Sequence, residues 1–159
     1  MPYLGICLGM QVAVIEFARN VCGVADATSG ELDPACAHKV IDFLPDQSES
    51  VSKGGTLRLG AYPCRVQAGT VPRRCSGAEE IRERHRHRYE FNNDYRETLA
   101  DAGLRLCGQS PDGHIVEAVE LSDKRFFIGV QFHPEFKSRP NRPHPLFVGL
   151  VAASMKGNK

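Results

Sequence analysis

A cysteine set between two glycines near the start of the chain constrains the fold more than any other feature of the sequence. An apolar run over residues 2–6 leads into the pentapeptide GICLG, residues 5–9, and apolar residues then recur at helical spacing as far as Gly23. The form G-x-nucleophile-x-G predicts a sharp turn from a strand into a helix, with glycines where the backbone passes too close for side chains. This segment therefore predicts a strand, a tight turn and a helix in immediate succession.

The predicted turn would place Cys7 at the amino-terminal end of that helix. Free N–H groups and the helix dipole are expected to lower the thiol pKa there and to favour the nucleophilic thiolate. The N–H of Leu8 would point to where a developing oxyanion needs a donor. On the five residues alone, a buried cysteine in a tight turn is an equally good interpretation, so a catalytic interpretation requires a partner base.

His133 is the best candidate for that base. It lies just beyond the predicted apolar strand 126–132, where strand ends of an α/β sheet present catalytic groups. Pro134 restricts the backbone so that Glu135 can accept a hydrogen bond from one imidazole nitrogen while the other faces the thiol. A His-Pro-Glu tripeptide by itself is typical of a surface loop, but together with the cysteine turn it predicts a Cys–His–Glu catalytic set.

Composition excludes several other classes of protein. The 20 Lys and Arg nearly balance the 19 Asp and Glu, whereas proteins that coat nucleic acid or membranes carry an excess of basic residues. The six cysteines are irregularly spaced and form no CxxC pair, which argues against a zinc site or disulfide framework and favours a reducing compartment. The apolar run 2–17 is too short and too polar to span a bilayer. We expect a cytoplasmic domain with no metal, nucleic-acid or membrane partner.

Periodicity and turn signals predict alternating strands and helices along the rest of the chain. The predicted strands cover residues 40–44, 57–66, 87–91, 104–108, 115–121 and 126–132. The predicted helices cover residues 78–84, 95–102 and 146–155, and a polar loop is predicted over 45–55. Turns at 111–113 and 122–124 join the last three strands. This order predicts an α/β sandwich around a largely parallel sheet.

Four segments together resemble a known family. PYLGICLGMQ at 2–11 and QFHPEF at 131–136 are similar to the class I glutamine amidotransferases. GGTLRLG at 54–60 and ERHRHRYE at 83–90 narrow the resemblance to the amidotransferase domains of CTP synthases, rather than those of GMP synthetases or carbamoyl phosphate synthases. The match runs in order over essentially the whole chain. It implies the class I amidotransferase fold, an α/β three-layer sandwich with a mixed, mainly parallel central sheet.

The resemblance implies a glutaminase reaction that supplies ammonia. Cys7 would attack the side-chain amide of L-glutamine, His133 would shuttle the proton and Glu135 would orient His133, with a glutamyl thioester as intermediate. In the intact family enzyme the ammonia reaches an amino-terminal synthase domain, where UTP activated by ATP with Mg²⁺ becomes CTP. No cofactor is implied for residues 1–159, and a homo-oligomer is implied for the full-length enzyme.

The resemblance also assigns residues that bind glutamine. Four consecutive residues form the pocket, namely Leu8, Gly9, Met10 and Gln11. Glu31 and Arg88 would hold the amino-acid end, and this is sound chemistry because an α-ammonium suits a carboxylate and an α-carboxylate suits a two-pronged guanidinium.

The arginines at alternate positions from 82 to 88 have an alternative interpretation. They could line one face of a strand and bind phosphate or nucleic acid. Acidic residues at 79, 80, 83 and 90 offset them and few aromatic residues accompany them, so the glutamine-binding role of Arg88 is favoured. His85 and His87 are interpreted as strand residues rather than metal ligands.

The sequence departs from the family at two places. Gly30 stands where the family usually has Thr, which loosens the backbone that aims Glu31. The synthase domain and the first strands of the amidotransferase domain, with a glycine-rich loop that supplies a second oxyanion donor, are not in the sequence. A strand carrying such a turn is normally central in its sheet, so we expect residues 1–159 to be a partial, amino-terminally truncated amidotransferase domain.

Two alternatives follow from these departures. Without the second oxyanion donor, the chain could be a non-catalytic fragment that acts as a binding or assembly module. The cysteine turn is also shared across the superfamily, so the chain could instead be an amidotransferase that serves another acceptor.

Overall fold

The computed structural model describes residues 1–43 and 58–155, so the predicted loop 45–55 lies outside the described residues. The strands are β1 (Tyr3–Ile6), β2 (Thr28–Ser29), β3 (Lys39–Asp42), β4 (Arg58–Val66), β5 (Glu80–His87), β6 (Glu90–Phe91), β7 (Leu104–Gln109), β8 (Val116–Leu121) and β9 (Phe127–Val130). The helices are α1 (Leu8–Asn20), α3 (Val71–Ser76), α4 (Arg96–Asp101) and α5 (Pro145–Met155), with single 3₁₀ turns η1 (Asn93–Tyr95) and η2 (Pro134–Lys137).

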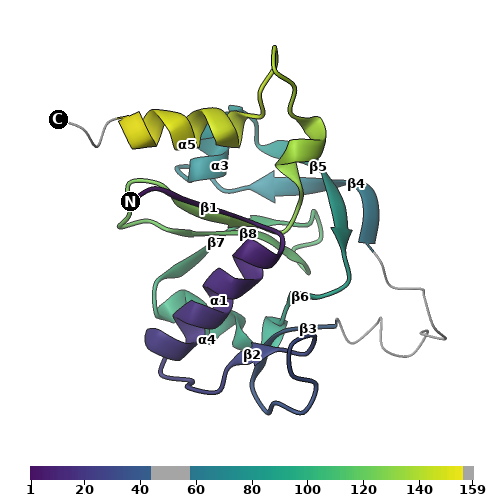
Figure 1. Ribbon diagram of the computed structural model, residues 1–159, viewed down its shortest axis with the longest axis vertical. Helices are drawn as coiled ribbons and strands as arrows, with labels where there is room; N and C mark the ends of the chain where they lie inside the picture. The colour runs from purple at the N-terminus through teal and green to yellow at the C-terminus, as the bar shows by residue number, and fades with distance from the viewer. Residues whose placement is uncertain (44–57, 156–159) are drawn as a thin grey trace.

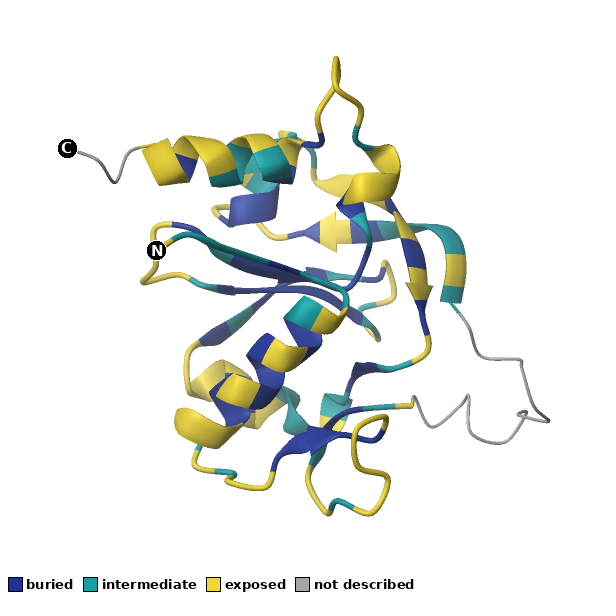
Figure 2. Ribbon diagram, viewed as in Figure 1, coloured by how far each residue is buried: buried dark blue, intermediate teal, exposed yellow. Residues whose placement is uncertain are grey.

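The helices cover both faces of a central sheet (Figure 1). One buried apolar cluster joins α1 and α4 to one face, around Met10, Val14 and Leu99. A second cluster joins α3 and α5 to the other face, around Ile128 and Phe132. In Figure 2 the dark, buried residues accordingly line the strands and the inward sides of the helices. The predicted three-layer α/β sandwich is confirmed.

The six strands of the central sheet follow the order β1-β9-β8-β7-β4-β5, and β2, β3 and β6 form a small second sheet. β1 runs parallel to β9, whereas the other neighbouring pairs in the six-stranded sheet are antiparallel. The sheet is mixed as predicted, but the expectation of a mainly parallel sheet is wrong. The short turns that join β7 to β8 and β8 to β9 explain the difference, because a parallel pair needs a crossover of a dozen residues or more.

The predicted helix over 78–84 is also wrong, because these residues open the long strand β5. The exposed arginines of β5 alternate with Glu83, His85 and His87, which are buried. Alternation with a period of two puts the two sets on opposite faces of a strand, and a helix would mix them. The predicted strand 87–91 is divided between the end of β5 and the two-residue strand β6, with a link at residues 88–89. The remaining predicted elements are present with boundaries shifted by a few residues.

In the described part of the chain β1 lies at the edge of its sheet, with β9 as its single neighbour. Both strands point the same way, so their carboxyl ends lie next to each other at Ile6 and Val130. Cys7 follows one end and His133 follows the other within three residues. The topology therefore brings together two groups that are far apart in the sequence. None of the described helices is long and apolar enough to cross a membrane.

Candidate active site

The turn at Cys7 has the strained geometry that the sequence predicts. Cys7 has φ 51° and ψ −106°, and it is the one non-glycine residue with positive φ in the described ranges. A Cβ at Gly5 would lie 2.8 Å from the carbonyl carbon of Gly9, which explains the glycine there. The Cys7 N–H donates to the Val130 carbonyl at 2.8 Å, and the Tyr3 hydroxyl donates to the Gly9 carbonyl at 2.8 Å. Such a backbone persists only where its surroundings hold it, typically at functional sites.

The expected lowering of the Cys7 pKa is not observed. Burial of the thiol is the largest influence and raises its pKa, and the nearby carboxylates of Glu135 and Glu31 act in the same direction. Hydrogen bonds from the Leu8 N–H and the Gln131 side chain lower the pKa but are outweighed. Cys7 in the resting site is therefore a thiol, and a base must remove its proton before it can act as a nucleophile.

His133 is oriented by Glu135, as the tripeptide predicts. The Nδ1 atom of His133 lies 2.6 Å from the Glu135 carboxylate, and its backbone N–H donates to the Arg84 carbonyl at 2.8 Å. The imidazole also stacks on Phe136, with ring centroids 4.9 Å apart. Its other nitrogen, Nε2, is buried and has no hydrogen-bond partner among residues 1–43 and 58–155. The imidazole thus has one nitrogen held by a carboxylate and the other available to a reacting group.

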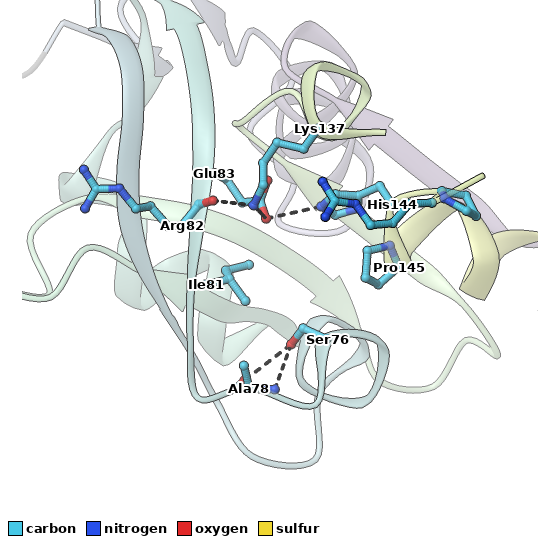
Figure 3. A pocket seen from close by; sticks show the side chains of 10 residues that line it. Ser76, Ala78, Ile81, Arg82, Glu83, Lys137, His144 and Pro145 are labelled. Carbon is cyan, nitrogen blue, oxygen red and sulfur yellow. Dashed lines mark hydrogen bonds and ion pairs between the residues drawn. The ribbon is translucent and has the colours of Figure 1, made fainter. Parts of the chain in front are cut away.

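An ion pair between the exposed Lys137 and the buried Glu83 holds the η2 turn that carries Glu135. Lys137, the last residue of η2, donates to the Arg82 carbonyl at 2.6 Å and to the carboxylate of Glu83 at 3.0 Å. Figure 3 shows Glu83 between Lys137 and His144, whose Nε2 lies 3.2 Å from the same carboxylate oxygen. All three side chains line a cavity of about 420 Å³. They anchor η2 to β5 and so fix the position of Glu135.

A cleft of about 370 Å³ opens beside the cysteine. It is lined by residues from the turn into α1 and its first turn, the loop after β2, the end of β5 and the link from β5 to β6, namely Cys7, Leu8, Gln11, Glu31, Arg86, His87, Arg88 and Tyr89. Of the six predicted glutamine-binding residues, Gly9 and Met10 are not in this lining. Met10 is fully buried and packs against Gly129. Leu8 and Gln11 are three positions apart and share one helix face, whereas Met10 faces the sheet.

The backbone of Gly30 is held by a hydrogen bond, and the Asp42 side chain lies close to it. Its N–H donates to the Ile41 carbonyl at 2.9 Å, and a Cβ at this position would collide with the carboxylate of Asp42. A threonine at this position would require the partly exposed Asp42 side chain to move aside. The hydrogen bond holds the chain that leads to Glu31, which is exposed at the cleft.

Several residues of the site were missed by sequence reasoning. Gln131 is fully buried, and its side-chain nitrogen lies 3.5 Å from the Cys7 sulfur. Tyr89, His87 and Arg86 line the cleft. A polar glutamine inside the apolar run 126–132 is an available signal for the first of these, because buried polar groups need partners. Arg86 and His87 end β5, a strand whose first part was predicted as a helix, and Tyr89 lies in the link from β5 to β6.

A cluster of buried charges lies behind the cleft. Arg58 contacts the carboxylates of Glu117 at 2.6 Å and Glu90 at 3.8 Å. His85 lies 3.3 Å from Glu117, and its Nδ1 lies 2.9 Å from Nε2 of the cleft residue His87. Burial raises the pKa of Glu117 to about 7 and that of Glu90 to about 8. Burial also lowers the pKa of His85 to about 2 and that of His87 to about 4, so both imidazoles are neutral.

Comparison with known proteins identifies relatives over the whole chain. The family model for glutamine amidotransferase class-I matches residues 1–153. The chain is 61% identical over 159 residues to a CTP synthase of Carboxydothermus hydrogenoformans, covering all of this chain and 30% of that protein. It is 62% identical over 154 residues to a CTP synthase of Rubrobacter xylanophilus, covering 97% of this chain and 28% of that protein. The chain thus spans less than a third of the length of these relatives.

Solved structures agree with these sequence matches. A Trypanosoma brucei CTP synthase glutaminase domain with bound acivicin superposes with a TM-score of 0.90 at 40% identity, covering 98% of this chain and 60% of that one. A Thermoplasma acidophilum protein described as a putative GMP synthase component superposes with a TM-score of 0.57 at 19% identity, covering 98% of this chain and 58% of that one, which shows a shared fold.

Proposed function

Because this chain belongs to the class I glutamine amidotransferase family, as a glutaminase domain of the CTP synthase type, we propose that it hydrolyses the side-chain amide of L-glutamine and releases ammonia. One observation carries this proposal: the strained Cys7 and the His133–Glu135 pair follow adjacent ends of the parallel strands β1 and β9. A nucleophile and an oriented base at one sheet edge are the groups that acyl transfer requires.

The first half of the reaction acylates the cysteine. His133 takes the thiol proton on Nε2, while the Glu135 carboxylate holds Nδ1 and stabilises the imidazolium. The sulfur attacks the amide carbon, a C–S bond forms, and the carbonyl oxygen becomes an oxyanion that the Leu8 N–H stabilises. His133 then returns the proton to the amide nitrogen, the C–N bond breaks, and ammonia is released. Cys7 now carries a γ-glutamyl thioester.

The second half releases glutamate. His133 removes a proton from a water molecule, whose oxygen attacks the thioester carbon. The C–S bond breaks and the sulfur recovers the proton, so the free thiol is restored. The raised pKa of Cys7 suits this step, because a thiol is the stable form of the resting enzyme.

Charge pairing would select glutamine in the cleft. Glu31 lines the cleft and would bind the α-ammonium, and the guanidinium of Arg88 lines it too and would bind the α-carboxylate. Gln11 and Leu8 would contact the side chain between these ends and the sulfur. Gly9 and Met10, which the family resemblance also assigns to the pocket, would act through the backbone and the packing of α1.

In a protein of the relatives' length, we propose that the ammonia passes to a synthase domain. That domain would use ATP with Mg²⁺ to activate UTP and would convert it to CTP, within a homo-oligomer. The hydrolysis itself needs no cofactor in this scheme. The cytoplasmic location predicted from the sequence remains a prediction.

The first test is covalent labelling with a diazoketone analogue of glutamine, followed by peptide mass spectrometry. We expect labelling of Cys7 in preference to the other five cysteines. Glutamine should protect Cys7, whereas γ-aminobutyrate, which lacks both the side-chain amide and the α-carboxylate, should not. Equal labelling of all cysteines, or none at Cys7, would show that this chain does not form the glutamine site and would favour a binding or assembly module.

The second test addresses the acceptor. In the protein of the relatives' length, Cys7→Ala should abolish CTP formation from glutamine and UTP while CTP formation from added ammonia continues. Ammonia transfer to another acceptor, with none to UTP, would assign the domain to a different amidotransferase.

A further inference from the structure

A line of hydrogen bonds runs along the wall of the cleft from a backbone carbonyl to the sulfur of Cys7. The side-chain nitrogen of Gln11 donates to the Tyr89 carbonyl at 3.1 Å and to Oε1 of Gln131 at 3.2 Å. Nε2 of Gln131 then donates to the Cys7 sulfur at 3.5 Å. Gln11 is 3% exposed and Gln131 is fully buried, so water does not compete for these groups.

The direction of every bond in this line is determined by its first member. A backbone carbonyl can only accept, so Gln11 must turn its NH₂ group toward Tyr89. The second hydrogen of that NH₂ group points to Gln131, whose side-chain oxygen must accept it. Gln131 is therefore left with its own NH₂ group facing the sulfur, and the amide cannot be turned round without two unsatisfied buried contacts.

Gln131 is also held by its backbone. Its N–H donates to the Glu117 carbonyl of the central strand β8 at 2.9 Å. The residue lies two positions before His133, on the same short segment that follows β9. The donor to the sulfur and the base for its proton are thus set by one short stretch of backbone.

A donor aimed at the sulfur has two chemical consequences. The S–H proton of Cys7 cannot point toward the Gln131 NH₂ group, because two donors would then face each other, so it must point elsewhere in the site. Once the proton leaves, the thiolate gains a charge-assisted hydrogen bond, which is stronger than the bond to the neutral thiol.

We propose that Gln131 is a positioning residue for the proposed glutaminase reaction: its amide, aligned by Gln11, turns the Cys7 proton toward His133 and stabilises the thiolate each time it forms. This inference rests on the proposed role of Cys7 as the nucleophile. It adds to that function a residue with no contact to the cleft, since Gln131 does not line it.

The test is the pH dependence of Cys7 alkylation by iodoacetamide, a reaction that needs no glutamine pocket. The rate is followed by mass spectrometry of the Cys7 peptide. Gln131→Met keeps the size of the side chain and removes the donor, and it should raise the apparent pKa of Cys7 by about 0.5–1 pH unit, the shift that one hydrogen bond supports. Gln11→Met should cause a smaller rise of the same sign, because Gln131 would lose its alignment.

The charged and titratable groups around Cys7 stay unchanged in these variants, namely Glu31, Glu135, His87, Arg86 and Arg88, together with His133 beyond the adjacent strand end. Ile128→Val is the matched control, since it loosens the neighbouring core of β9 without touching the sulfur. It should leave the alkylation profile in place.

Superimposable profiles for the parent chain and both methionine variants would overturn the proposal. If Gln131→Met does not fold, judged by circular dichroism, the Gln11→Met profile decides alone. Failure of glutamine to protect Cys7 from the diazoketone would instead contradict the glutaminase function, and the iodoacetamide profile would still report on Gln131.

Discussion

The pair His133–Glu135 and the pair His85–Glu117 contain the same two residue types in opposite surroundings. In the first pair the atoms are 2.6 Å apart, and the side chains are 17% and 44% exposed. In the second pair the atoms are 3.3 Å apart, and both side chains are fully buried. Both pairs lie close to strands of the same sheet, so the comparison isolates the effect of solvent and neighbours.

Burial decides what each pair can do. Around His85 and Glu117 it disfavours both charged forms, and the cation that balances the carboxylate is Arg58 rather than the imidazole. Around His133 no such cation is needed, because Glu135 remains in contact with solvent. The exposed pair keeps a nitrogen for proton transfer, whereas the buried pair is suited to holding strands in register. Residue types alone would not have distinguished them.

Replacing the histidine of one pair at a time should produce the largest difference between the two pairs. His133→Ala should lower the rate of glutamate release by about 10²–10⁴-fold, the usual contribution of a general acid–base group, while the free energy of unfolding changes little. His85→Leu should mainly destabilise the fold, because it removes a fully buried imidazole and its contacts with His87 and Phe132. Paired activity assays and denaturant titrations measure both, and equal losses of activity would contradict the distinction.

Removing the buried cation Arg58 should cause a large loss of stability. Arg58→Met is expected to lower the free energy of unfolding by about 3–5 kcal/mol, because it leaves Glu117 and Glu90 as uncompensated buried acids. The matched control is Arg65→Met on the same strand, whose pair with Glu80 is more than half exposed. That change should cost about 0–1 kcal/mol. Similar losses in urea titrations at pH 8 would refute the role of burial.

The same buried carboxyl groups should also make the free energy of unfolding depend on pH, and this effect should be smaller. Glu117 and Glu90 have pKa values raised from 4.5 to about 7 and about 8, so the folded state keeps protons that the unfolded state has released. Their contribution is lost as the pH rises through the folded values. From pH 6.5 to 8 the loss should be on the order of 2 kcal/mol.

The histidines act in the opposite sense at low pH. His85 and His87 have pKa values lowered from 6.5 to about 2 and about 4, so the unfolded state binds protons more readily below pH 6.5. Their contribution is lost as the pH falls. We expect a plateau in the free energy of unfolding near pH 5–6 that declines on both sides. The double variant Glu90→Gln, Glu117→Gln should flatten the alkaline side, and a parent chain with no decline from pH 6.5 to 8 would contradict the raised values.

Much of the site could be predicted because its signals are local. The turn at Cys7 follows from glycines at fixed positions, and the contact between His133 and Glu135 spans two residues. The family assignment also followed from short segments, and the family model over residues 1–153 confirms it. Glu31 and Arg88, assigned through the resemblance, do line the cleft beside the cysteine.

Errors arose where the structure depends on what a residue packs against. The segment 78–84 was predicted as a helix, although its alternating charges belong to a strand with one buried face. The position of Cys7 at a helix end predicts a lowered pKa, but burial of the thiol raises it. The motif did not indicate that the Met10 side chain is turned into the core.

By itself, the sequence determined the strand, strained turn and helix around Cys7, the pairing of His133 with Glu135, and the family. These depend on backbone sterics and on neighbours a few residues apart, which a linear pattern records. Tertiary structure alone decided the order of the strands, the raised pKa of the thiol and the contact between Gln131 and Cys7, whose residues are 124 positions apart. These depend on burial and on which segments meet in space, and neither is set by local sequence.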